Sequence, residues 1–139
     1  MRGVLVDTNA WLRYLLRDND IQYKEMSLLM KKMKKGEVEL ILANEVVLEI
    51  CYVLKSFYKI DKEKISKELS NLVLVKGIVA NSIWKAVLPI YSQKNLSLLD
   101  ILMKCLASSN GWELFTFDKK LKTPRSTPPC SSTNIPPLI

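Results

Sequence analysis

Four acidic residues stand out because each lies within or directly after an apolar stretch of the chain: Asp7, Glu49, Asp100 and Asp118. A carboxylate in apolar surroundings is costly unless a counter-charge or a metal ion compensates it. Several carboxylates at one place would repel one another, and a divalent cation such as Mg2+ relieves the repulsion because it prefers carboxylate oxygens and retained waters. Such a site could perform metal-assisted attack of water on a phosphodiester.

The composition narrows the alternatives. The chain has no histidine, which excludes a Ser-His-Asp triad, a Cys-His pair and the His acid–base pair of metal-free ribonucleases. The three cysteines, Cys51, Cys105 and Cys130, are widely spaced and predict neither a disulfide framework nor a zinc site. The net charge of +7 favours a polyanionic partner, either nucleic acid or an anionic membrane surface.

Two of the acids follow short apolar runs that predict buried strands. Asp7 comes after residues 3–6 and Asp118 after residues 114–117. The carboxyl ends of parallel strands are where open α/β sheets bind ligands. Each acid also has a simpler interpretation, since Asp7 could cap the following helix and Asp118 could be an ordinary turn residue.

The other two acids lie in predicted helices. Helical spacing places Glu49 on one face with apolar residues, so a buried carboxylate is expected there, paired either with a metal or with a neighbouring Lys or Arg. That face comprises positions 46, 49, 50, 53, 54 and 57. Asp100 lies among large apolar residues, but Ser97-x-x-Asp100 also resembles a capping box, in which the acid would satisfy the helix start.

Strands and helices are expected to alternate along the chain. Short apolar runs predict strands at residues 3–6, 38–43, 72–75 and 114–117. Helical periodicity and capping residues predict helices at about 10–16, 21–35, 45–58, 61–71, 81–93 and 97–109. This alternation predicts right-handed βαβ units around a parallel sheet, an α/β fold.

The chain divides by composition into residues 1–122, which suit one domain, and residues 123–139, a Pro-, Ser- and Thr-rich tail without helical period. Asp7 comes too early for a signal peptide, and no apolar run is long enough to span a bilayer. We therefore expect a cytoplasmic protein without a membrane anchor.

The order and spacing of these motifs resemble the PIN-domain family. The four motifs are VLVDTN at residues 4–9, VVLEICYVL at 46–54, LSLLD at 96–100 and FTFD at 115–118. The closest subgroup is the VapC-type toxins of toxin–antitoxin pairs. The resemblance implies a three-layer α/β/α fold with a central parallel sheet and an endoribonuclease that depends on Mg2+ or Mn2+. The implied metal ligands are Asp7, Glu49, Asp100 and Asp118.

The same resemblance implies further site residues and partners. Asn9 and Thr116 match polar positions that support the site, although capping or turn bonding would also explain them. RNA is the implied substrate, an antitoxin protein the implied partner and a homodimer the implied assembly. The sequence departs from the family pattern after Lys122, where the tail begins, and at Ile101, which stands where a small residue is usual.

Basic residues offer places for phosphate groups. One run lies at residues 31–35 and a second at 119–125, directly after Asp118, where it is better placed beside the metal ligands. Arg13 and Arg17 are four positions apart and should share a helix face. Three other functions are alternative interpretations of the same residues. A magnesium-dependent phosphatase would need a second Asp after Asp7, and a receiver-like signalling domain would need an Asp at the end of a middle strand; the sequence has neither. A non-catalytic RNA-binding or scaffold protein of the same fold stays open.

Overall fold

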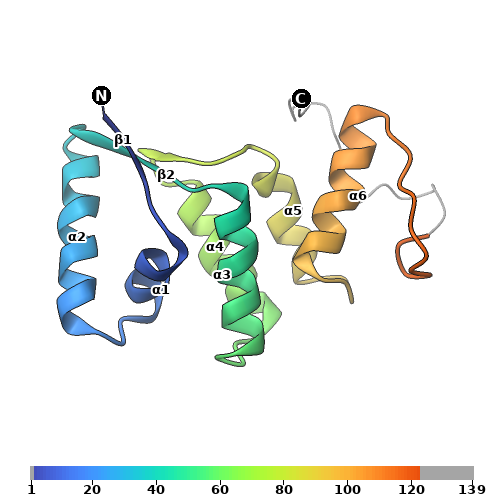
Figure 1. Cartoon of the computed structure of the whole chain (residues 1–139), viewed down its shortest axis with the longest axis horizontal. Coiled ribbons are helices and arrows are strands. Elements are labelled where there is room, and N and C mark those ends of the chain that lie inside the picture. Colours follow the sequence, from blue (N-terminus) through green and yellow to red (C-terminus); the bar gives the residue numbers. More distant parts are fainter. Residues whose placement is uncertain (1, 123–139) are drawn as a thin grey trace. The chain divides into compact units, whose positions relative to one another are not determined.

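The computed structural model describes residues 2–122, which form two compact units. The first unit contains the residues up to 60 together with 71–81, and the second contains 61–70 and the residues from 82 onward. The elements in chain order are β1 (Arg2–Leu5), α1 (Thr8–Leu16), α2 (Asp20–Lys34), β2 (Val38–Ile41), α3 (Asn44–Ser56), α4 (Lys62–Val73), β3 (Ile78–Val79), α5 (Trp84–Tyr91) and α6 (Leu98–Asn110) (Figure 1).

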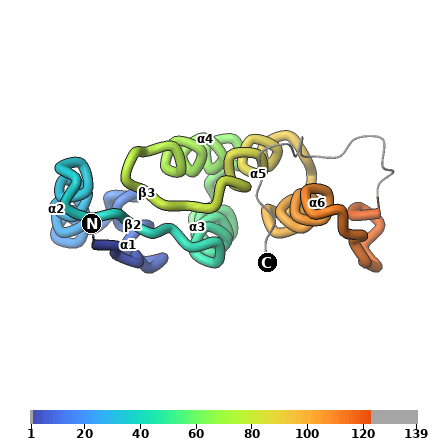
Figure 2. Tube along the Cα trace, turned by 90° about the horizontal axis from the view of Figure 1, so that it is seen from above, coloured from blue at the N-terminus to red at the C-terminus, as the bar shows by residue number. Residues whose placement is uncertain are grey.

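The first unit contains a three-stranded parallel sheet in the order β1-β2-β3 (Figure 2). Gly3 lies opposite Glu39, and Leu40 lies opposite Ile78. Between neighbouring strands the chain passes through helices, as parallel pairing requires. The α/β class with a parallel sheet is therefore confirmed.

The core of the first unit joins the sheet to its helices. Trp11 of α1, Leu40 of β2 and Val47 of α3 are fully buried. Met33, on the buried face of α2, lies against Gly77, where an added Cβ would come within 2.5 Å of the Met33 Cγ. Because Gly77 also has φ of +101°, both its backbone and its surroundings require glycine.

The second unit is helical. α5 and α6 pack against each other and bury Trp84, Leu88 and Ile101. The hydroxyl of Ser66 in α4 donates a hydrogen bond of 2.6 Å to the carbonyl of Leu88, which satisfies the one polar side chain that is buried among the described residues. Cys105 is buried and disulfide-bonded, which the cysteine spacing did not predict.

Capping side chains mark four of the six helix starts that the structure describes. The side chain of Asn19 accepts a hydrogen bond from the backbone N–H of Gln22, and Asp61 accepts one from Lys64. Gly111 ends α6 in the left-handed conformation with φ of +68°. No helix between residues 2 and 122 is both long and apolar enough to cross a bilayer.

Two strand predictions were wrong, and a third was right about the strand but wrong about its burial. Residues 72–75 finish α4 and the turn after it, and the third strand comes at β3 instead. Residues 114–117 form no strand, and Phe117 is 84% exposed. β1 exists but is not fully buried, because it lies at the edge of the sheet and leaves Leu5 69% exposed. The predicted tail, residues 123–139, lies outside the described residues.

Candidate functional site

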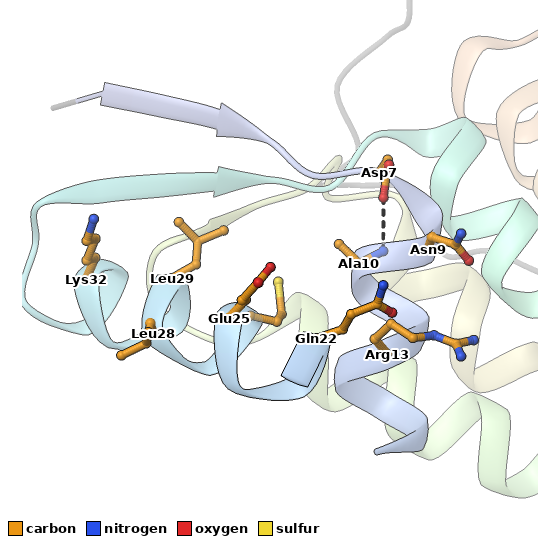
Figure 3. A pocket seen from close by; sticks show the side chains of 10 residues that line it. Asp7, Asn9, Ala10, Arg13, Gln22, Glu25, Leu28, Leu29 and Lys32 are labelled. Carbon is orange, nitrogen blue, oxygen red and sulfur yellow. Dashed lines mark hydrogen bonds between the residues drawn. The ribbon is translucent and has the colours of Figure 1, made fainter. Parts of the chain in front are cut away.

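Asp7 caps the first helix. Its Oδ1 atom accepts a hydrogen bond of 2.9 Å from the backbone N–H of Ala10 (Figure 3). The capping interpretation of Asp7 is thus confirmed, but it uses only one oxygen. Within the part of the chain that the structure describes, no hydrogen bond reaches the other oxygen, Oδ2, and the side chain is exposed. A cap and a ligand are therefore compatible roles for one carboxylate.

Asp7, Asn9 and Glu49 line the same cavity. We call it the α1–α3 cavity; its volume is about 450 Å³. It is lined by Asp7 and the first two turns of α1, and by the part of α3 from Glu49 onward with the residues after it. The remaining lining residues are Thr8, Leu12, Arg13, Val53, Phe57 and Tyr58. The chain thus brings together two of the four predicted acids and one of the two predicted supporting residues.

Glu49 lines this cavity from an exposed face of α3, not from the buried face that the sequence predicts. The sequence places it on a buried apolar stripe, but its side chain is exposed. The face of α3 that packs into the core carries Val47, Ile50, Cys51 and Leu54. α3 has apolar residues on more than one face, so the predicted stripe was rotated from the real one. The carboxylate is therefore accessible to solvent and to a ligand without a burial cost.

A second cavity, which we call the α1–α2 cavity, adjoins Asp7 from the side of α2. Its volume is about 600 Å³, and Asp7, Asn9 and Arg13 line it together with residues of α2. Gln22 and Glu25 extend from α2 on the side that faces α1 (Figure 3). Sequence reasoning missed Glu25, although the spacing of positions 22, 25, 29 and 32 marks one face of this helix.

Arg13 contributes to both cavities. Its Nη1 donates a hydrogen bond of 2.8 Å to Asp18 Oδ2, and its Nη2 donates one of 3.3 Å to the hydroxyl of Tyr58. The hydrogen bond to Tyr58 and the charge of Asp18 together hold the pKa of Arg13 above its usual value. Arg17 behaves differently, since it ends α1 in the left-handed conformation and lies 4.9 Å from the centre of the Tyr23 ring.

The other two predicted acids belong to the second unit, and each makes local hydrogen bonds. Asp100 and Ser97 form the capping box at the start of α6, with Asp100 N–H donating to Ser97 Oγ and Ser97 N–H to Asp100 Oδ2. Asp118 lies in a turn rather than at a strand end, and its Oδ1 accepts from the N–H of Lys120. The Thr116 hydroxyl accepts from the N–H of Asp118.

Basic side chains lie near these acids in each unit. Lys32, from the first basic run, lines the α1–α2 cavity. In the second run, Lys119, Lys120 and Lys122 are exposed, whereas Arg125 lies outside the described residues. The first run therefore supplies a cation to the wall of the α1–α2 cavity, which Asp7 also lines, although the sequence favoured the second run.

Comparison with known protein families gives one result. The family model of the PIN domain matches residues 4–125, which is most of the chain. The chain belongs to the PIN-domain family. No curated protein and no solved structure matches it. Membership indicates a nuclease-type hydrolase that acts on nucleic acid.

PIN-domain nucleases generally use divalent metals, and the residues of this PIN domain fit such an ion in kind. Asp7 and Glu49 offer carboxylate oxygens and Asn9 an amide oxygen around one cavity, and Mg2+ is commonly held by one or two carboxylates together with its own waters. Between residues 2 and 122, no group of three or more Asp, Glu or Cys side chains gathers closely enough to hold a metal ion. The fit therefore rests on the pair in the α1–α3 cavity.

Proposed function

We propose that this PIN domain is an endoribonuclease that depends on Mg2+ or Mn2+. The observation that carries the proposal is the α1–α3 cavity, which Asp7 and Glu49 both line although they are far apart in the sequence. Two carboxylates lining one accessible cavity are suited to a hard divalent cation. The family membership supports a nuclease, and the net charge of +7 suits a polyanionic substrate.

In this proposal each residue has a defined task. Asp7 and Glu49 hold the cation, and Asn9 orients a carboxylate or a water beside it. The motifs predict Asp100 and Asp118 as further ligands, with Thr116 supporting Asp118, and in the second unit each of these two acids makes local hydrogen bonds. The bound cation supplies the activation of water and the stabilisation of charge on the phosphoryl oxygens. Arg13 supplies a permanent positive charge on the wall of the same cavity.

The test is cleavage of labelled structured RNAs, including tRNAs, by the full chain with Mg2+, with Mn2+ and with EDTA. We expect cleavage with either metal and none with EDTA. Asp7→Asn and Glu49→Gln should each lower the cleavage rate by about 100-fold or more, as the loss of a group that stabilises the transition state does. Glu45→Gln is the matched control, since Glu45 is an exposed acid of the same helix and does not line the cavity. Equal rates for Glu49→Gln and Glu45→Gln would contradict the proposed ligand.

A second candidate function is RNA binding without catalysis. It is favoured by one observation, namely that no three acids gather into a metal-holding group among the described residues. This alternative predicts RNA binding that neither metal addition nor Asp7→Asn changes, together with no cleavage of any RNA in the panel. Gel-shift titration in parallel with the cleavage assay separates the two functions.

A toxin role is the finer part of the proposal and rests on the resemblance of the motifs to VapC-type toxins. It predicts that expression of the chain arrests growth, that Asp7→Asn relieves the arrest, and that a co-expressed antitoxin protein does the same. The homodimer and the cytoplasmic location also stay predictions. Light scattering of the purified chain measures the first, and fractionation of expressing cells measures the second.

A further inference from the structure

Two aromatic rings line the α1–α3 cavity beside the carboxylates. Phe57 is 78% exposed and Tyr58 is 37% exposed, and both line the cavity with Asp7 and Glu49. Burying a Phe side chain contributes about 1.5–3 kcal/mol to folding, and Phe57 forgoes most of that gain. An aromatic ring that remains in water at the wall of a cavity is available to a ligand.

These rings are held in place by a chain of contacts. Phe57 ends α3, and its backbone N–H donates a hydrogen bond of 2.9 Å to the carbonyl of Val53. The Phe57 ring meets the Tyr58 ring edge to face, with centroids 5.4 Å apart. The Tyr58 hydroxyl in turn accepts the hydrogen bond from Arg13, which is paired with Asp18. The ring of Phe57 is therefore supported from α1 and needs little ordering when a ligand arrives.

We propose that Phe57 is a stacking platform for an unpaired RNA base next to the phosphodiester that Asp7 and Glu49 address. This inference rests on the proposed ribonuclease function and adds to it a residue that binds a base of the substrate. An unpaired base presents its face to an aromatic ring, whereas a base within a duplex has both faces covered by its neighbours. The net charge of +7 favours the phosphates of an RNA that carries such a base.

The test is a binding titration of the full chain with a short single-stranded RNA that carries 2-aminopurine, performed in EDTA so that no metal-dependent cleavage intervenes. We expect binding with quenching of the fluorophore, which reports stacking. Phe57→Leu should weaken binding roughly 5- to 150-fold and abolish the quenching, because base–aromatic stacking is worth about 1–3 kcal/mol. Phe57→Trp should preserve both, and binding of a duplex RNA should not respond to either substitution.

Tyr52→Leu is the matched control. Tyr52 lies on the same helix and is 69% exposed, but it does not line the cavity. Equal single-strand binding by Phe57→Leu and Tyr52→Leu would overturn the inference, as would a lack of single-strand binding by the unaltered chain. A ring that docks a protein partner instead would give the first of these results. Cleavage of the RNA panel is scored separately, so cleavage that persists without stacking leaves the proposed function standing.

Discussion

Asp7 combines two roles that substitution can separate. Its Oδ1 accepts the N–H of Ala10 at the start of α1, and the carboxylate as a whole is the proposed metal ligand. Asp7→Ala removes the capping bond, which typically costs about 1 kcal/mol, and also the favourable charge at the helix N-terminus, worth about 0.3–1 kcal/mol. Asp7→Asn keeps an equivalent capping oxygen and loses only the charge.

The expected ranking follows from these two contributions. The free energy of unfolding should fall by about 1.5 kcal/mol for Asp7→Ala and by about 0.5 kcal/mol for Asp7→Asn. For a chain of 139 residues, the difference of about 1 kcal/mol corresponds to a Tm difference of roughly 3–4 °C. Thermal unfolding followed by circular dichroism measures it. Cleavage should be lost in both variants, because both remove the carboxylate.

Two results would refute this reasoning. If Asp7→Ala and Asp7→Asn have the same Tm, the hydrogen bond to Ala10 contributes nothing to α1. If Asp7→Asn cleaves RNA at the rate of the unaltered chain, the carboxylate is not a ligand. Asp7→Ser is a useful third variant, since serine is also a good capping residue but carries no charge. It should resemble Asp7→Asn in both measurements.

Other substitutions test the fold. Gly77→Ala should lower the free energy of unfolding by about 2–3 kcal/mol, because Gly77 has a left-handed backbone and Met33 crowds its Cα. Gly36→Ala should lower it by only about 1 kcal/mol, because Gly36 has φ of +78° but open space around it. Equal Tm values for the two variants would contradict the crowding at Gly77. Phe117→Ala should change the free energy of unfolding, measured in urea, by less than about 0.5 kcal/mol because the ring is exposed. A loss of about 3 kcal/mol would instead indicate that Phe117 lies in a buried strand. Ser97→Ala should cost about 1 kcal/mol and speed hydrogen exchange at the N–H of Asp100, and unchanged exchange would argue against the capping box.

The sequence predicts the helices well because their ends depend on neighbouring residues. Asp61 and Gly111 each satisfy backbone groups within a few positions of themselves, so their types alone mark the boundaries. The capping box of Ser97 and Asp100 was visible for the same reason. Asp7 and Glu49 line one cavity, but the side chain of Glu49 is exposed there, whereas the sequence predicted it on a buried face of its helix.

The strands were harder to predict because a strand depends on its partner. The apolar run before Asp118 suits a strand, but no other described segment pairs with it. An apolar run such as residues 3–6 indicates β structure without saying whether the strand is central or at an edge. The orientation of Glu49 was also missed, because a helix with apolar residues on several faces does not reveal which face meets the core.

The contact between Met33 and Gly77 bears on how readily the Met33 sulfur is oxidised. The Met33 thioether is 3% exposed, and its Cγ and sulfur fill the space that any Cβ at Gly77 would need. Peroxide converts methionine to a larger, polar sulfoxide, which this space has no room to accept. Oxidation of Met33 therefore requires α2 to separate from the chain before β3. The rate of Met33 oxidation, measured by mass spectrometry and compared with that of the half-buried Met103, therefore reports how often the first unit opens.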